Sequence, residues 1–190
     1  RHDPTLRSST EPKGIEPIPS SWVAYVAKHN ALAEFTARAI DACRASATPV
    51  AVENPASRSD PQSPAWWPKY SDHGSLWHMP CIAAALGAYH ARFHTFAQCS
   101  FHERGAGSQK WTTVAAAGGM TRTLAGLGSA RYAYQHGREA HPEVLSGRDA
   151  LGRSRAGMAA AYPRALNELL ATAIATAAQA RRASAQRAHP

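Results

Sequence analysis

Two stretches of sequence decide the fold: RFHTFAQ at residues 92–98 and QKWTTVAA at residues 109–116. Aromatic and β-branched residues are frequent in both, and such side chains favour β-strands. The segment between them, residues 101–108, contains two glycines and predicts a turn. We therefore expect the two strands to pair as a long hairpin, ended by the Gly-Gly pair that follows the second stretch.

Three helices are expected around this hairpin. Apolar residues recur at helical spacing from Trp22, and this helix should stop before Pro49. Ser20 or Ser21 could cap its first turn. A short helix is expected from Pro80, closed by a glycine, and a long last helix from Pro163, because proline suits the first turn of a helix. Residues 121–128 add one or two helical turns.

A third strand is predicted at residues 49–55, an apolar run that ends in polar residues and a proline. The order helix, strand, helix, strand, strand, helix indicates the α/β class, as a sandwich with a mostly parallel sheet and one antiparallel hairpin. Three strands are few for a doubly wound sheet, so we expect part of a larger domain. The expected organisation is an irregular lead-in at residues 1–20, a folded domain at residues 21–180 and a basic tail at residues 181–190.

Composition supports a folded, basic protein. The chain has 190 residues, of which 44% are hydrophobic, and 21 basic against 13 acidic residues give a net charge of +8. Such a charge favours nucleic acid or another acidic partner. No apolar run approaches the length of a membrane span and no secretory signal is visible, so we expect no membrane partner and an intracellular location, with the nucleus as one option. The chain begins with Arg1 rather than Met, which predicts a fragment or a processed chain.

The first candidate site is the sequence Val-Glu-Asn-Pro at residues 52–55. Ligands of open α/β sheets bind beyond the carboxyl ends of the strands, and Glu53 is expected at such an end. A carboxylate there can accept hydrogen bonds from a base edge, a ribose or an amine. The alternative is a structural glutamate that caps the next helix or pairs with an arginine.

The second candidate site flanks the turn of the hairpin. Gln98 and Lys110 stand on either side of it and could form the rim of a cleft, although ordinary surface polarity on a hairpin explains them equally. Cys99 lies next to Gln98. It could act as a nucleophile only beside a base or a positive charge, and the sequence places neither there.

Two loops carry further candidates. Arg148, Arg153 and Arg155 form a basic segment that could clamp phosphates, or could be a solvated basic face. The loop at residues 56–74, which we call the aromatic loop, holds three prolines, two tryptophans and a tyrosine. A long loop with three aromatic residues is usually packed or functional rather than a free linker.

Ten histidines and three cysteines invite a metal hypothesis, but their spacing does not support one. No HExxH sequence and no zinc-finger spacing is present, and the widely spaced cysteines exclude a disulfide scaffold. We predict no metal site. The sequence also contains no Walker loop and no G-x-G-x-x-G turn.

An ordered series of short motifs between Leu6 and Ala175 carries a family resemblance. The series comprises Leu6-Arg7, His29-Asn30-Ala31-Leu32, Val52-Glu53-Asn54-Pro55, Ser75-Leu76-Trp77, Phe96-Ala97-Gln98-Cys99, Gln109-Lys110-Trp111-Thr112-Thr113, His136, His141, Gly147 and Tyr162-Pro163. In this order the motifs resemble the C-terminal half of a Rossmann-type cytosine-C5 DNA methyltransferase, of the kind found in algal and protist genomes near mobile elements.

The resemblance implies a partial Rossmann-like sheet flanked by helices, with S-adenosylmethionine as cofactor. In this family a strand ends in Glu-Asn-Val, and its glutamate contacts the target base. Glu53-Asn54-Pro55 is similar, with proline in place of valine. Gln109-Lys110 is a loose match to the family's Gln-x-Arg-x-Arg segment. The Gly-rich cofactor turn and the catalytic Pro-Cys segment have no counterpart, so the chain is expected to bind the cofactor only with a preceding half and to methylate nothing alone.

Three functions follow as hypotheses. In the first, the chain is the C-terminal part of a DNA methyltransferase-like protein. Glu53 would then orient a flipped base, and the substrate would be held by Asn54, Pro55, Gln98, Lys110, Arg148, Arg153 and Arg155. In the second, the chain is a non-enzymatic nucleic-acid-binding relic of a mobile-element protein, with salt-dependent DNA binding. In the third, it is a histidine-rich metal or interaction module.

Overall fold

The computed structural model describes residues 5–101, 110–129, 141, 150–153 and 161–188. Helices and strands are mixed along the described chain, with several short 3-10 turns among them. In order they are α1 (Val23–Ala45), β1 (Val50–Pro55), α2 (Pro80–Ala88), β2 (Arg92–Ala97), β3 (Trp111–Ala117), α3 (Met120–Thr123) and α5 (Arg164–Ala188). This order confirms the predicted mixture of helices and strands.

The three strands form one antiparallel sheet in the order β1-β3-β2. The predicted hairpin of β2 and β3 is confirmed, with Thr95 opposite Thr113. The expectation of a mostly parallel sheet is wrong, because β1 also pairs antiparallel with β3, with Glu53 opposite Val114. The reason is the position of β3: it returns from the hairpin and inserts between β1 and β2, so the two strands joined through α2 are not neighbours.

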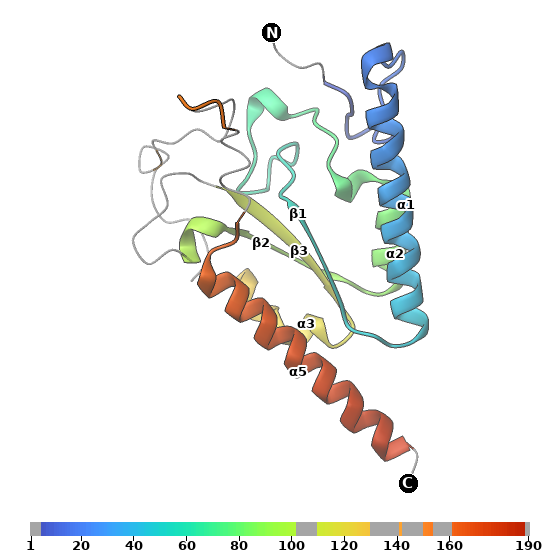
Figure 1. Cartoon of the computed structure of the whole chain (residues 1–190), viewed down its shortest axis with the longest axis vertical. Helices are drawn as coiled ribbons and strands as arrows, with labels where there is room; N and C mark the ends of the chain where they lie inside the picture. The colour runs from blue at the N-terminus through green and yellow to red at the C-terminus, as the bar shows by residue number, and fades with distance from the viewer. Residues whose placement is uncertain (1–4, 102–109, 130–140, 142–149, 154–160, 189–190) are drawn as a thin grey trace.

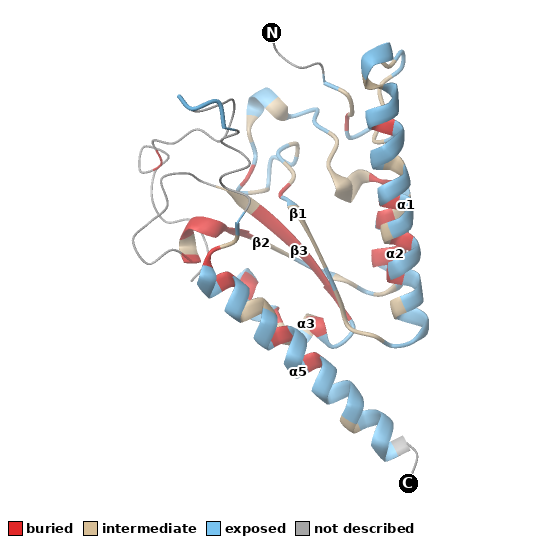
Figure 2. Ribbon diagram, in the orientation of Figure 1, coloured by how far each residue is buried: buried red, intermediate tan, exposed pale blue. Residues whose placement is uncertain are grey.

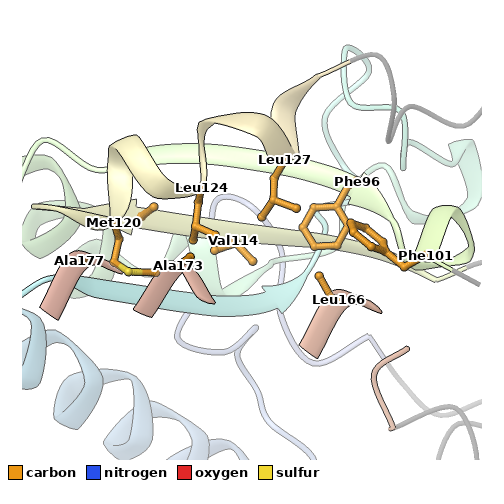
Figure 3. Packing of buried hydrophobic residues seen from close by; sticks show 10 residues of the cluster. Phe96, Phe101, Val114, Met120, Leu124, Leu127, Leu166, Ala173 and Ala177 are labelled. Carbon is orange, nitrogen blue, oxygen red and sulfur yellow. The ribbon is translucent and has the colours of Figure 1, made fainter. Parts of the chain in front are cut away.

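Helices cover both faces of the sheet (Figure 1). Side chains alternate between the faces of a strand, and β3 is buried from Thr112 to Ala117, which Figure 2 shows as a red central strand. Val114 and Ala116 pack with the α3 and α5 side, in the cluster of Figure 3. Ala115 packs on the opposite face, with buried residues of α1 and α2. The result is a helix–sheet–helix sandwich, as the element order predicted.

The ends of two helices differ from expectation. The structure describes α5 as helical to Ala188, so residues 181–188 of the predicted basic tail belong to the helix, and residues 189–190 lie outside the described residues. In Figure 1 the C-terminal part of α5 extends beyond the sheet. Arg181 in this part donates a hydrogen bond to the Ser46 carbonyl oxygen at 3.0 Å, which ties the helix to the end of α1. The predicted serine cap of α1 is wrong, because a 3-10 turn occupies Ser20–Trp22 and makes Trp22 the N-cap residue.

The lead-in before α1 contains no helix or strand in its described part, but it packs on that helix. The Arg7 guanidinium donates hydrogen bonds to the Asn30 side-chain oxygen at 2.6 Å and to the Val26 carbonyl oxygen at 3.1 Å. Ser8 is almost fully buried. Among the described helices, none is both long enough and apolar enough to cross a membrane.

Candidate functional site

Three of the predicted site residues, Glu53, Gln98 and Lys110, lie at one edge of the sheet, although the strands are not paired as predicted. β1 and β2 are each antiparallel to β3, so they run in the same direction and their carboxyl ends share an edge with the start of β3. Glu53 lies near the end of β1. Gln98 and Lys110 lie just beyond β2 and just before β3, where the Gln98 N–H donates to the Lys110 carbonyl oxygen at 2.9 Å. This edge therefore gathers a carboxylate, an amide and an ammonium group.

Glu53 points to the face of the sheet that α5 covers, because it is paired with the buried Val114. Tyr162, two residues before α5, donates a hydrogen bond from its hydroxyl to the Glu53 carboxylate. Burial raises the pKa of Tyr162, and the hydrogen bond and charge of Glu53 raise it further. The Oε1 atom of the Glu53 carboxylate is buried and has no hydrogen-bond partner. Glu53 thus keeps one acceptor oxygen unused.

Lys110 contacts the same tyrosine from another side. Its Nζ lies 5.2 Å from the centroid of the Tyr162 ring, within the range of a cation–π interaction. Tyr162 is held in turn by Asn167, whose side-chain amide donates to the Tyr162 carbonyl oxygen at 3.3 Å. One aromatic ring at the entry of α5 therefore connects the predicted glutamate with the predicted lysine. We call Glu53, Lys110 and Tyr162 the strand-end cluster.

Gln98 has a different environment from the one predicted. It is only 4% exposed, and its side-chain amide donates a hydrogen bond to the Thr112 hydroxyl at 2.7 Å. Thr112 is fully buried. A buried amide paired with a buried hydroxyl satisfies polar groups of the interior. The structure therefore places the Gln98 side chain in the interior, paired with Thr112, rather than on the rim of a cleft.

Asn54 and Glu53 lie on opposite faces of the sheet, because neighbouring residues of a strand alternate. Asn54 is paired with Thr113, whose hydroxyl is 2.8 Å from that of Thr95 on the α1 and α2 side. The Asn54 side-chain amide donates a long hydrogen bond, 3.4 Å, to the Pro55 carbonyl oxygen. Pro55 is exposed at the end of β1. Asn54 therefore does not lie on the face of the sheet to which the Glu53 carboxylate points.

The basic segment is mostly outside the described part. Arg148 and Arg155 lie outside the described residues, and the prediction of a phosphate clamp remains a prediction. Arg153 is described and is exposed. Its exposure is what a phosphate contact requires, and a solvated basic face has the same property.

Acid–base and nucleophilic chemistry find no support in the described geometry. His94 faces Val114 from the other side, so one row across the sheet reads Glu53, Val114, His94. Its Nε2 is also buried without a partner, and burial lowers the pKa of His94. Val114 lies between these residues, and neither Glu53 Oε1 nor His94 Nε2 has a hydrogen-bond partner, so the two groups are not paired. Burial also raises the pKa of the Cys99 thiol, which disfavours its nucleophilic thiolate form.

Metal ligands are not gathered in the part of the chain that the structure describes: no three His, Cys, Asp or Glu side chains come together there in a way that could hold an ion. The two glycines after β3, predicted to end the hairpin, are closely packed. A Cβ on Gly118 would lie 2.7 Å from the Tyr89 hydroxyl, and one on Gly119 would lie 3.3 Å from Cγ of Pro49.

The main residue that sequence reasoning missed as part of the site is Tyr162. It belongs to the Tyr-Pro motif of the family resemblance, but no local pattern relates it to Glu53, which is far away in the chain. A large polar aromatic residue directly before a helix-opening proline was the available signal.

No protein-family model matches the sequence, no curated protein matches it, and no solved structure matches the fold. Membership of the methyltransferase family is therefore not shown.

Proposed function

We propose that this protein binds nucleic acid, with the strand-end cluster as part of the contact surface. The observation that carries the proposal is the convergence of Glu53, Lys110 and Tyr162 at one edge of the sheet. The cluster combines a cation, an aromatic ring and a hydrogen-bond acceptor. These are the three kinds of group that contact phosphates, base faces and base edges.

The charge of the chain supports the same function. The net charge of +8 attracts a polyanion, and neutralised phosphates release counterions. Lys110 is the cation of the cluster and is suited to a phosphate. Glu53, in contrast, would weaken phosphate binding by repulsion. Its Oε1 is buried, so we propose that a base becomes its hydrogen-bond donor only after the Tyr162 side chain moves away from the carboxylate. Cytosine and adenine carry exocyclic amino groups that can donate to such an acceptor.

The first test is the salt dependence of binding. A fluorescent oligonucleotide of about 20 nucleotides is titrated with the protein between about 50 and 200 mM salt, and anisotropy gives the Kd. We expect the logarithm of the binding constant to fall linearly with the logarithm of salt concentration. Lys110→Ala should reduce this slope by about 0.7 for a single strand and about 0.9 for a duplex. Lys28→Ala, a change of an exposed lysine on α1, is the matched control and should leave the slope unchanged.

The result that contradicts the proposal is equally direct. A binding constant that does not change with salt, or that changes identically for both lysine variants, would remove the strand-end cluster from the contact surface.

Methyl transfer is the second candidate. What supports it is the resemblance of residues 52–55 to the base-contacting strand end of cytosine-C5 methyltransferases, together with the unused oxygen of Glu53. The antiparallel sheet does not provide the crevice on which the expectation from parallel strands relied. The base-contacting role of Glu53 can be tested apart from catalysis.

In this test, the affinities for oligo(dC) and oligo(dT) are compared. We expect the protein to prefer oligo(dC) by about 5-fold, the lower limit for one specific base contact. Glu53→Gln should abolish this preference, because the amide presents a donor as well as an acceptor. Glu34→Gln, an equivalent change at an exposed position of α1, should retain it. Equal affinities of the unaltered protein for both oligonucleotides would exclude base recognition by Glu53, and with it the structural support for methyl transfer.

A further inference from the structure

The aromatic loop directly follows β1 and leaves the sheet at the edge that carries the strand-end cluster. It begins with Ala56, whose N–H donates to the Trp111 carbonyl oxygen at 3.1 Å. It closes on itself where the Trp67 N–H donates to the Arg58 carbonyl oxygen at 3.1 Å. Ala65 is buried and anchors its middle. In Figure 1 its helical turn, at residues 68–70, lies beyond the end of β1.

Three aromatic rings of this loop contact one another, and the exposed Trp66 directly precedes them in the sequence. The rings of Trp67 and Tyr70 are in edge-on contact with centroids 6.0 Å apart, and those of Tyr70 and His73 are 4.8 Å apart. Trp66 precedes this chain of rings and is 41% exposed. A single exposed ring needs no function by itself, so a binding role for Trp66 depends on the rings and cations of the same loop.

Two cations accompany the rings. The Arg58 guanidinium lies 5.3 Å and the Lys69 ammonium 5.8 Å from the centroid of the Tyr70 ring. Both residues are exposed. Cation–π contacts hold these side chains beside the rings, where their remaining N–H donors can reach a phosphate.

The charge of the loop decides what kind of contact dominates. Arg58 and Lys69 are balanced by Asp60 and Asp72, so residues 56–74 have no net charge with histidine neutral. One of the two acidic groups is engaged within the loop, since the Asp60 carboxylate accepts a hydrogen bond from the Gln62 N–H at 2.9 Å. A neutral loop gains little from general attraction to a polyanion. Stacking on the exposed ring must therefore supply most of its binding energy.

We propose that the aromatic loop is a stacking platform for an unpaired nucleotide, in which Trp66 stacks on a base while Arg58 and Lys69 contact the adjoining phosphates. This inference rests on the proposed nucleic-acid binding and specifies its form. Bases of a duplex are stacked on each other and do not expose their faces, whereas those of a single strand do. The loop therefore selects single-stranded DNA or RNA over a duplex.

The experiment measures anisotropy with one mixed sequence of about 20 nucleotides as single-stranded DNA, as single-stranded RNA and as duplex DNA. Trp66→Ala should weaken binding of single strands by about 5- to 150-fold, the range measured when a stacking aromatic residue is removed, and should leave duplex binding unchanged. Trp66→Phe should restore most of the affinity, because a smaller ring still stacks. The matched control is Phe35→Ala, which removes a 61% exposed ring on α1 and should change neither affinity.

The outcomes separate this inference from the proposal on which it rests. If salt-dependent binding persists and Trp66→Ala binds single strands like the unaltered protein, the stacking platform is wrong and nucleic-acid binding stands. If the unaltered protein binds none of the three nucleic acids, both are wrong. The urea midpoint of each variant is measured alongside, and Trp66→Phe gives the answer if the alanine variant is less stable. A DNA–RNA difference for single strands would show which of the two the platform takes.

Discussion

The attachment of α5 to the sheet gives the sharpest test of the architecture, because α5 positions Tyr162. Leu166, in the first turns of α5, is 1% exposed and belongs to the cluster with Phe96, Val114 and Leu127 (Figure 3). Leu166→Ala removes three carbon atoms, worth about 2.4 kcal/mol of lost burial at about 0.8 kcal/mol each. The cavity left behind adds to this, and measured losses for buried leucines are about 2–5 kcal/mol. We expect a loss of about 3 kcal/mol.

The matched variant is Ile174→Ala, two turns later on the same helix. Ile174 is 57% exposed, so its truncation should change stability by no more than about 0.5 kcal/mol. Urea unfolding followed by circular dichroism measures both, and an unchanged m value shows that the midpoints report stability. For a chain of this size, about 3 kcal/mol corresponds to a fall in Tm of about 6–12 °C. Equal losses for the two variants would refute the packing of α5 against the sheet through the Leu166 face.

Two predictions concern pH. Burial and Glu53 raise the pKa of Tyr162, so the unfolded chain releases this phenolic proton first, and the stability of the fold is complete below about pH 10 and falls as the pH rises above it. Tyr162→Phe should lose about 1 kcal/mol of stability at neutral pH and show a smaller loss at alkaline pH. An alkaline profile identical to that of the unaltered protein would contradict the hydrogen bond to Glu53. Because burial lowers the pKa of His94, the unfolded chain takes up a proton first as pH falls below about 6.5, and stability should drop there. Between about pH 7.5 and 5.5, the urea midpoint should fall less for His94→Gln than for His29→Gln, the control at an exposed position. Parallel curves for the two variants would argue against a buried His94.

Secondary structure was largely readable from the sequence because the local signals agreed with the packing. The run from Thr112 to Ala117 is almost continuously apolar or β-branched, and it forms a strand buried on both faces. Prolines marked the start of α2 and preceded that of α5. The pairing of strands was not readable. Whether β1 lies beside β2 or beside β3 depends on contacts between distant segments, and the hydrophobic pattern of β1 is the same in either case.

The candidate site also combines features that follow from local sequence with features that depend on contacts between distant segments. Glu53 and Lys110 were found because polar residues at strand ends and beside turns follow from local pattern. The opposite orientation of Asn54 was predictable too, since adjacent residues of a strand face opposite ways. The burial of Gln98 was not, because it depends on Thr112 across the hairpin. Tyr162 was out of reach for a further reason: its contact with Glu53 exists only once α5 lies on the sheet.

The error in strand direction left the site in place, and the reason is geometric. A parallel sheet brings carboxyl ends together by direct pairing, whereas here β3 separates β1 and β2 but leaves them pointing the same way. The end of β1 therefore faces the turn side of the hairpin in both arrangements. The aromatic loop also begins at the end of β1, so its start lies at the edge of the sheet that carries Glu53 and Lys110. In the proposed complex, a flexible single strand would follow this edge, whereas a rigid duplex could not present an unstacked base there without opening.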